Sequence, residues 1–488
     1  MDQCNRRDFF QLAGLSSAGA ALFPKLGKSD EPAFQALEKT VAPNAPNIVF
    51  IITDDQRWDY LGCMGHPVLK TPHIDRLAKE GALFRNFFTC IPLCSPSRAS
   101  FLTGLYPHSH LVINNDKLGL DVISYTLITF PRQLREAGYE TAFLGKWHMG
   151  LNDSRRIGFD TWFSFKGQGV YIDGAANDNG VERQLDGYMT DILNARAVEF
   201  IQQRHTKPFC LYLAHKAVHA PFLPSPRHSA LYADYQFKLP PQNPHDIAGK
   251  PVMNRPKSHI DVLDLEGVAP EPSDSRRGRG NTPQAVVLDQ LRCLAAVDEG
   301  IGAIREALKR SGQLDNTIIV FTSDNGYLMG EHGIVNEKRW AYDESIRVPM
   351  VMRYPKLIAP NTVQDALVLN VDIAPTLLDL AGVKSIVPMH GHSLVPLLRD
   401  AKAPWRDKFL AEYYLEKCAP ITPSWRAVRS ENWKYIHYYN ESDNLDELYD
   451  LRTDPKEEKN LAGDSNAQPV LHEMRQALEQ LLKTAKRV

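Results

Sequence analysis

Two apolar segments far apart in the chain, residues 47–52 and 316–322, are each followed by polar side chains. The side chains that follow them are Asp54, Asp55, Asp324 and Asn325. Continuous apolar runs of this length are typical of strands buried in a parallel sheet. Open α/β sheets bind their ligands at the C-terminal ends of such strands. An Asp pair that caps a turn would explain the first of these sites alone. Because polar residues follow a second apolar strand as well, the pattern favours one shared binding site.

These four residues offer only oxygen ligands. Carboxylate and carbonyl oxygens suit hard divalent cations such as Ca²⁺ or Mg²⁺, whereas zinc sites usually include histidine or cysteine. A carboxylate-rich site built from protein ligands favours Ca²⁺, because Mg²⁺ usually keeps several of its waters. We therefore expect a Ca²⁺ site here, with Mg²⁺ as the alternative.

Other expected strands are also followed by residues that can take part in catalysis. Residues 139–144 end before Lys146 and His148, and residues 208–213 end before a segment that contains His219. Helices are expected at residues 71–80, 131–137, 287–310 and 374–381, and further strands at residues 348–353 and 367–371. This alternation predicts an α/β fold with a large, mostly parallel sheet flanked by helices.

The pattern changes near residue 395. The sequence then favours antiparallel strands and a final helix, at residues 425–430, 433–439, 447–451 and 468–486. We therefore expect a large α/β domain at residues 40–392 and a smaller C-terminal α+β subdomain at residues 393–488. Residues 225–285 are rich in proline and poor in periodic apolar residues, which predicts an insertion or rim loop.

The N-terminus resembles an export signal. Residues 5–10 (Asn-Arg-Arg-Asp-Phe-Phe) precede an apolar run of small residues from Leu12 to Leu22. Paired arginines before such a run are typical of twin-arginine signals, although a basic amphipathic start shares some of these features. We expect residues 1–35 to be a signal and linker, and the mature protein to be periplasmic or secreted.

Composition argues against several partners. The chain has 56 Lys plus Arg and 58 Asp plus Glu, and this formal net charge of -2 does not favour nucleic acid. No later segment is long and apolar enough to span a bilayer, so we expect no membrane span in the mature chain. The seven cysteines include no Cys-x-x-Cys pair, which argues against a disulfide scaffold.

Residues 94–104 (Cys-Ser-Pro-Ser-Arg-Ala-Ser-Phe-Leu-Thr-Gly) contain the candidate nucleophile, Cys94. Pro96 suits the first turn of a helix, and a neighbouring serine is expected to cap it. Helix N-termini attract anions, and Arg98 is expected to offer its guanidinium donors to an oxyanion. The segment predicts a site for an anionic ester, although a single cysteine near an arginine is more often structural.

The Cys-x-Pro-Ser-Arg stretch with the trailing Thr-Gly resembles the signature of type I sulfatases, which belong to the alkaline phosphatase-like superfamily. The resemblance covers about residues 45–465. It implies that a maturation enzyme oxidises Cys94 to formylglycine, whose hydrated aldehyde attacks sulfur and later expels sulfate. It also implies that Cys94 contacts a metal held by Asp54, Asp55, Asp324 and Asn325.

The same resemblance implies roles for the remaining residues. Lys146, Lys338 and His219 would hold the sulfate oxygens, and His219 or Lys338 would protonate the leaving oxygen. His148 would assist the release of sulfate, and Arg98 would orient the nucleophile. The roles of His215 and Lys216 stay open.

The expected substrate is a sulfated glycan or sugar. Residues 167–187, the rim loop and the surroundings of Trp340 and Trp425 are expected to form its pocket, because aromatic side chains suit sugar rings. Segments such as residues 215–221 resemble bacterial N-acetylglucosamine-6-sulfatases. Choline sulfate and aryl sulfates are alternative substrates. A phosphomonoester or phosphonate hydrolase and a non-catalytic sulfated-glycan-binding protein are alternative functions.

Overall fold

The main sheet has ten strands in the order β13-β2-β12-β9-β1-β8-β4-β5-β6-β7. The computed structural model describes residues 41–42, 44–115, 119–241, 244–253, 282–416, 419, 422–439 and 445–486. The expected signal at residues 1–35 and much of the expected rim loop, residues 254–281, lie outside the described residues.

The centre of the main sheet is parallel. Its central strands are β9 (Thr317–Ser323), β1 (Asn47–Thr53), β8 (Phe209–Ala214), β4 (Glu140–Gly145) and β5 (Thr161–Ser164). The flanking strands are β13 (Thr362–Gln364), β2 (Ala82–Phe84), β12 (Met350–Arg353), β6 (Ala175–Asp178) and β7 (Val181–Gln184). β12 runs antiparallel to β9, and β6 runs antiparallel to β5. The predicted large, mostly parallel sheet is confirmed.

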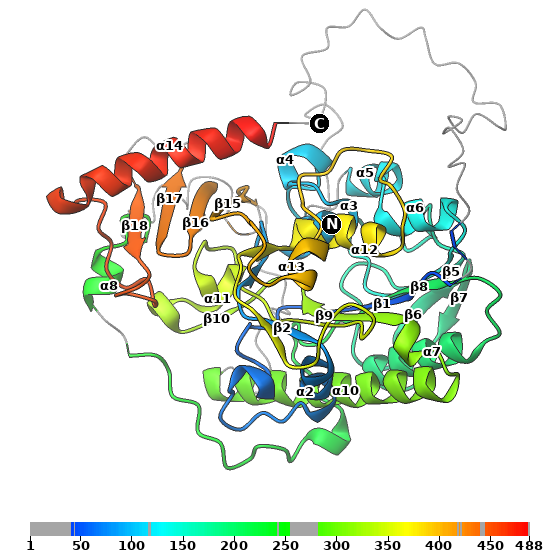
Figure 1. Ribbon diagram of the computed structural model, residues 1–488. Coiled ribbons are helices and arrows are strands. Elements are labelled where there is room, and N and C mark those ends of the chain that lie inside the picture. Colours follow the sequence, from blue (N-terminus) through cyan, green and yellow to red (C-terminus); the bar gives the residue numbers. More distant parts are fainter. Residues whose placement is uncertain are drawn as a thin grey trace, which may run out of the picture. The chain divides into compact units, whose positions relative to one another are not determined.

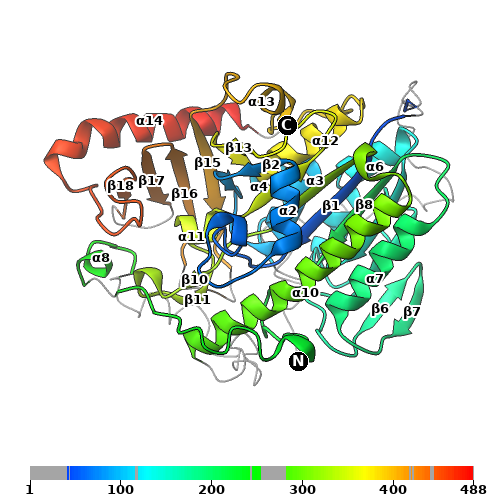
Figure 2. The ribbon, with the colours of Figure 1, turned by 60° about the horizontal axis from the view of Figure 1, so that its bottom comes forward.

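Helices cover both faces of this sheet. On one face lie α2 (Pro72–Glu80), α7 (Met189–Gln202) and α10 (Pro283–Arg310), and on the other α3 (Cys94–Thr103), α6 (Phe130–Glu136) and α12 (Ile373–Leu380) (Figure 1). Figure 2 turns the first face forward and shows α10 running beside α7. Thr282 caps α10 by accepting a hydrogen bond from Ala285 N at 3.2 Å. The centre of the sheet is therefore buried on both sides, as its apolar strands predict.

Shorter elements join these layers. They include η1 (Gly62–Met64), β3 (Phe87–Phe88), α4 (Pro107–His110), α5 (Leu120–Thr126), η2 (Pro226–His228), α8 (Pro244–Ala248), η3 (Leu314–Asn316), β10 (Leu328–Met329), η4 (Glu331–Gly333), β11 (Val335–Glu337), α11 (Asp343–Ile346), α13 (Val395–Arg399) and η6 (Ser465–Ala467).

The strand expected at residues 367–371 is much shorter than predicted. Only β14 (Val368–Leu369) is extended, and it pairs with β3 rather than with the main sheet. The carboxylate of Asp372 accepts a hydrogen bond from Leu369 N at 2.8 Å. This bond closes a turn, so that η5 (Asn370–Asp372) leads directly into α12. The longer strand was wrong because a side chain supplied the hydrogen bond that a neighbouring strand would have supplied.

A second, antiparallel sheet lies in the C-terminal part. Its strands are β15 (Lys408–Tyr413), β16 (Trp425–Ser430), β17 (Trp433–Tyr438) and β18 (Glu447–Asp450). Helix α14 (Gln468–Thr484) buries Leu471, Met474 and Leu478 against it. The predicted C-terminal sheet and helix are confirmed, whereas the boundary at residue 393 stays a prediction. Among the described residues, no helix combines the length and the apolar character needed to cross a membrane.

Candidate active site

The C-terminal ends of four parallel strands meet at one edge of the main sheet. Strands β1, β9, β4 and β8 are each followed by residues that the sequence predicted to share a site. These residues are Asp54, Asp55, Asp324, Asn325, Lys146, His148 and His219. Backbone contacts fix the two acidic turns together, because Asp55 N donates to Asp324 Oδ1 at 3.2 Å.

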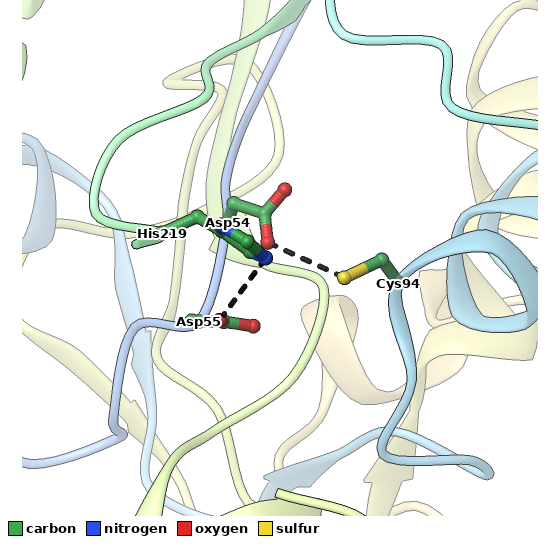
Figure 3. Close-up of side chains that lie close together, drawn as sticks. All are labelled: Asp54, Asp55, Cys94 and His219. Carbon is green, nitrogen blue, oxygen red and sulfur yellow. Dashed lines mark hydrogen bonds and ion pairs between the residues drawn. The ribbon is translucent and has the colours of Figure 1, made fainter. Parts of the chain in front are cut away.

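Cys94 lies against this edge at the beginning of α3. Its Sγ is 3.5 Å from Asp54 Oδ1 and 2.8 Å from Lys338 Nζ. Figure 3 shows Asp54, Asp55 and His219 gathered opposite Cys94. Lys338 also contacts the Asp55 carboxylate, so one ammonium group touches both the thiol and an acid.

Helix α3 is capped differently from the sequence prediction. No side chain at its N-cap residue, Leu93, makes a capping hydrogen bond, and both serines lie inside the helix. Ser97 Oγ instead donates to Asp324 O at 2.5 Å. The backbone N–H of Ser95, in the first turn of the helix, donates to Asn115 Oδ1 at 3.0 Å. The expected serine cap was wrong because tertiary contacts engage those hydroxyl groups.

The guanidinium of Arg98 is fully engaged by the protein. Its Nε donates to Asp324 Oδ2 at 2.8 Å, its Nη2 to Asp54 Oδ2 at 3.0 Å and its Nη1 to Lys146 O at 2.9 Å. The side chain is almost completely buried. Arg98 therefore ties together three strand ends, and the interaction of its remaining N–H donors with an oxyanion stays a prediction.

Burial and charge set the protonation of the acids. Burial alone would raise the pKa of Asp54, but the positive charge of Lys146, followed by His219 and Arg98, outweighs it and holds this pKa well below its usual range. Burial raises the pKa of Asp55 to about 6, against the opposing effect of Lys338. Lys146 Nζ contacts the Asp54 carboxylate directly.

The thiol of Cys94 is held in its protonated form. Burial, followed by the negative charge of Asp54, raises its pKa to about 12. The thiolate is the nucleophilic form of cysteine. An unmodified Cys94 is therefore a poor nucleophile at neutral pH.

His219 is oriented by its own turn. Its Nδ1 faces Ala220 O at 2.8 Å and must donate to it, which leaves Nε2 facing Asp55 Oδ2 at 3.7 Å. Lys216, whose role was open, donates from Nζ to the same carbonyl oxygen at 3.0 Å. Tyr171 OH donates to His219 O at 2.7 Å.

His148 lies against Ser95, the residue that follows Cys94. Ser95 Oγ donates to His148 O at 2.7 Å, which fixes this turn against the first turn of α3. Burial, followed by the positive charge of Lys146, holds the pKa of His148 well below its usual range. The imidazole is therefore neutral at neutral pH.

The donor groups at this edge fit a divalent cation. Ligand atoms of Asp54, Asp55, Cys94 and His219 all lie within 4.8 Å of one another. Asn325 Oδ1 is buried and makes no hydrogen bond among the described residues. Buried polar atoms are normally paired, so an unpaired amide oxygen beside acidic side chains suits a hard cation.

One residue near the site had no signal in the sequence. Asn115 is an ordinary loop amide until the fold brings it to α3. Trp340 and Trp425, expected to line a sugar pocket, are 3% and 0% exposed. Trp425 Nε1 donates to Arg339 O at 2.8 Å. Both rings fill the core, so neither ring itself faces a sugar, and the pocket expected in their surroundings stays a prediction.

Comparison with known proteins places this arrangement in a family. Residues 46–383 match the family described as Sulfatase. The chain belongs to the sulfatase family. Residues 330–484 of this sulfatase also match the family described as N-sulphoglucosamine sulphohydrolase, C-terminal. The family relationship identifies the chain as a sulfuric ester hydrolase, and members of the family typically use a metal ion and formylglycine.

Individual relatives cover most of this sulfatase. The N-acetylglucosamine-6-O-sulfatase of Bacteroides thetaiotaomicron is 33% identical over 90% of this chain and 87% of its own. The N-acetylglucosamine-6-sulfatase of Homo sapiens is 30% identical over 86% of this chain and 81% of its own. A solved protein in complex with its substrate, D-glucosamine-2-N,6-O-disulfate, is 32% identical with a TM-score of 0.78, over 91% of this chain and 98% of its own.

Proposed function

We propose that this sulfatase removes sulfate from a sulfated amino sugar, with the modified Cys94 as its nucleophile. The observation that carries this proposal is the position of Cys94 Sγ, 2.8 Å from Lys338 Nζ and 3.5 Å from Asp54 Oδ1. A group at this position is next to a cation that can hold an oxyanion and next to the acids that suit a metal.

The high pKa of the Cys94 thiol supports its modification. Because the thiol stays protonated at neutral pH, an unmodified side chain would attack a sulfate ester slowly. Formylglycine supplies an aldehyde hydrate with two hydroxyl groups, one for attack and one for the elimination of sulfate. The maturation enzyme that makes it is a proposed partner of this chain.

The basic residues around Cys94 have distinct positions. Lys338 and Lys146 are buried ammonium groups beside the Asp55 and Asp54 carboxylates, so they can bind the oxygens of a sulfate group. The Nε2 of His219 is the nitrogen left to face the substrate, and because burial holds the pKa of His219 well below its usual range, this nitrogen is an acceptor at neutral pH. His219 would have to take up a second proton before it could donate one, so the Lys338 ammonium is the better candidate to protonate the leaving oxygen.

His148 and Arg98 complete the proposed machinery. The neutral imidazole of His148 would accept the proton that is lost when sulfate is expelled. Arg98 would orient the nucleophile, because each of its three nitrogens donates to an oxygen of Asp54, Asp324 or Lys146.

The residues proposed to hold a metal are Asp54, Asp55, Asp324 and Asn325, with the modified Cys94 beside them. We favour Ca²⁺ over Mg²⁺, because the set is rich in carboxylates and Asn325 adds an amide oxygen. A bound divalent cation supplies positive charge that lowers the pKa of an oxygen nucleophile and neutralises developing negative charge.

The substrate and location follow from the relatives and the N-terminus. The two relatives named above as acting on N-acetylglucosamine 6-sulfate groups, and the glucosamine disulfate complex, support a glucosamine sulfated at O6. The paired arginines before an apolar run within residues 1–35 support export, so that the mature protein is periplasmic or secreted.

Sulfate release from N-acetylglucosamine 6-sulfate is the direct test. The protein is produced with a formylglycine-generating enzyme, and mass spectrometry of the tryptic peptide 86–98 scores Cys94 as a thiol or an aldehyde. We expect an aldehyde, sulfate release, loss of turnover after chelation and recovery with Ca²⁺. Cys94→Ala is the inactive control.

Matched esters separate the alternatives. Faster turnover of N-acetylglucosamine 6-phosphate would favour a phosphatase, and faster turnover of choline sulfate or an aryl sulfate would replace the sugar substrate. Sugar binding without turnover, with Cys94 still a thiol despite an active maturation enzyme, would overturn the proposed mechanism.

A further inference from the structure

Glu416 is a buried carboxylate that belongs to none of the groups described above. It follows β15 in the C-terminal part of the chain and is 0% exposed. Its two carboxylate oxygens accept hydrogen bonds from two different segments of the catalytic part, by which we mean residues 40–392. Oε2 binds Arg339 Nε at 2.6 Å, and Oε1 binds Asn115 N at 2.9 Å.

The first of these contacts reaches Lys338. Arg339 is its neighbour in the chain, so the position of the Arg339 backbone limits where the Lys338 side chain begins. Trp425 Nε1 donates to Arg339 O at 2.8 Å. Arg339 Nη1 donates to Glu337 Oε1 at 2.7 Å. Arg339 is thus fixed from both its backbone and its guanidinium, and Glu416 is the fully buried carboxylate among these partners.

The second contact reaches Cys94. Asn115 Oδ1 accepts a hydrogen bond from Ser95 N at 3.0 Å, in the first turn of α3. No capping hydrogen bond from the N-cap side chain is present in this helix, so Asn115 takes the place of a cap. Glu416 in turn holds the backbone of Asn115.

The two contacts meet again at the nucleophile, because Lys338 Nζ lies 2.8 Å from Cys94 Sγ. Glu416, Arg339, Lys338, Cys94, Ser95 and Asn115 therefore form a closed ring of contacts, which we call the Glu416 ring. We propose that Glu416 is a positioning residue that sets the separation of Cys94 and Lys338. This inference rests on the proposed function, in which those two side chains act on the same sulfate group.

The charge of Glu416 matters as well as its shape. A glutamine could still accept the hydrogen bond from Asn115 N, but its amide N–H group would then face the donors of Arg339. Two donors that face each other repel, and the buried guanidinium would keep only Glu337 as a carboxylate partner. Glu416→Gln should therefore displace the Arg339 side of the ring first.

Kinetics of Glu416→Gln test the proposal, with Asp446→Asn as the matched control. Asp446 is also a buried carboxylate of the C-terminal part with an arginine partner, Arg475 at 2.6 Å. After correction for the aldehyde content of peptide 86–98, we expect Glu416→Gln to lower kcat by about 10- to 100-fold, with KM changed by less than about threefold. Asp446→Asn should keep kcat within about twofold of the wild type.

A second measurement does not depend on turnover. Amide hydrogen exchange of residues 91–103 and 334–346 should become faster in Glu416→Gln but not in Asp446→Asn. Asn115→Leu, which leaves the ion pair with Arg339 in place, should speed exchange only in residues 91–103. This variant also keeps the test available if Glu416→Gln does not fold.

The outcomes separate the two proposals. A kcat for Glu416→Gln within about twofold of the control, or exchange equal to the control in both segments, would overturn the role of Glu416. A wild-type protein that matures but releases no sulfate would overturn the proposed function, and the exchange data would still decide whether the Glu416 ring positions the two segments.

Discussion

At the scale of single residues, the environment of a side chain decides its chemistry more than its type does. Cys94 is a thiol whose pKa is raised to about 12, first by burial and then by Asp54. Arg98 is a cation whose three nitrogens each donate a hydrogen bond to a protein oxygen. The sequence identified both residues as candidates, but it did not reveal these surroundings.

Lys216 gives a prediction at this scale. It shares the Ala220 carbonyl oxygen with His219 Nδ1, and its ammonium lies 5.2 Å from the centre of the Tyr171 ring. Lys216→Met removes one of the two donors that fix this turn. We expect kcat/KM for sulfate release to fall about 10- to 100-fold, because His219 loses its fixed orientation.

Lys216→Arg is the conservative partner of that change. It keeps a donor and a positive charge, so it should recover part of the lost activity, while both variants should unfold at similar temperatures. Equal activity of Lys216→Met and the wild type would show that Tyr171 and the turn itself are sufficient to hold His219.

At the scale of elements, α3 is held by its neighbours rather than by its own amphipathic face. All ten of its residues are buried, so no polar face turns to solvent. It ends at Gly104, whose φ of 70° is the left-handed conformation that glycine adopts readily. Ser100 Oγ connects α3 to α4 through His110 Nε2 at 3.0 Å.

His110 predicts a pH dependence of stability for this pair of helices. Val112 N donates to its Nδ1 at 3.1 Å, so Nε2 carries the proton towards Ser100. Burial, followed by the positive charges of His108 and His390, lowers the pKa of His110 to about 3 from its ordinary 6.5. Between these values the unfolded chain binds the proton and the folded chain does not, so this contribution to stability is lost as the pH falls from 6.5 towards 3.

The check is urea unfolding from pH 4 to 7. His110→Gln cannot titrate, so its free energy of unfolding should fall less steeply with acid than that of the wild type, by up to about 1.4 kcal/mol per pH unit. His110→Asn should share the shallower slope. Wild-type and variant slopes that agree would assign the acid sensitivity to other groups.

At the scale of the whole molecule, residues 40–488 form one compact unit. One apolar cluster contains residues of the catalytic part together with residues of β15 to β17. Its members include Phe88, Ile91, Leu328, Trp340, Phe409, Trp425 and Tyr435. The C-terminal part therefore covers apolar surface beside the active site.

Deletion of residues 393–488 should prevent folding. The remaining chain, residues 40–392, would expose its half of that apolar cluster and lose Glu416, so we expect aggregation and no cooperative unfolding transition. Differential scanning calorimetry of the truncated protein checks this. A cooperative transition would support the sequence-based boundary at residue 393 as the limit of an independent folding unit.

Lys250 connects a distant segment to the C-terminal sheet. It is 0% exposed, and its Nζ lies 2.8 Å from Tyr449 OH, 2.6 Å from Glu457 O and 2.8 Å from Asp246 Oδ1. Lys250→Met leaves the buried Asp246 without this cation. We expect a loss of about 3–5 kcal/mol in the free energy of unfolding.

Guanidinium unfolding measures that loss. Lys456→Met, at an exposed lysine close by in the C-terminal part, is the control and should change the free energy by less than about 0.5 kcal/mol. An equally small change for Lys250→Met would contradict this prediction. It would mean that the contacts of Lys250 stabilise the fold only by as much as burying its ammonium group costs.

By itself, the sequence determined the strands that form the site and the residues at their ends. Apolar runs such as residues 47–52 and the acids after them are local patterns. Such a pattern can be recognised without knowing how the rest of the chain folds. The family followed from the same kind of information, because the Cys94 segment is continuous in the chain.

The tertiary structure alone decided how those residues are held. Asn115 and Glu416 lie 301 positions apart, and no local pattern distinguishes a carboxylate that becomes fully buried from one at the surface. The wrong prediction of the α3 cap and the unexpected burial of the Trp340 and Trp425 rings share this cause. Hydrogen-bond partners and burial depend on which distant segments pack together, so they appear only after the chain has folded.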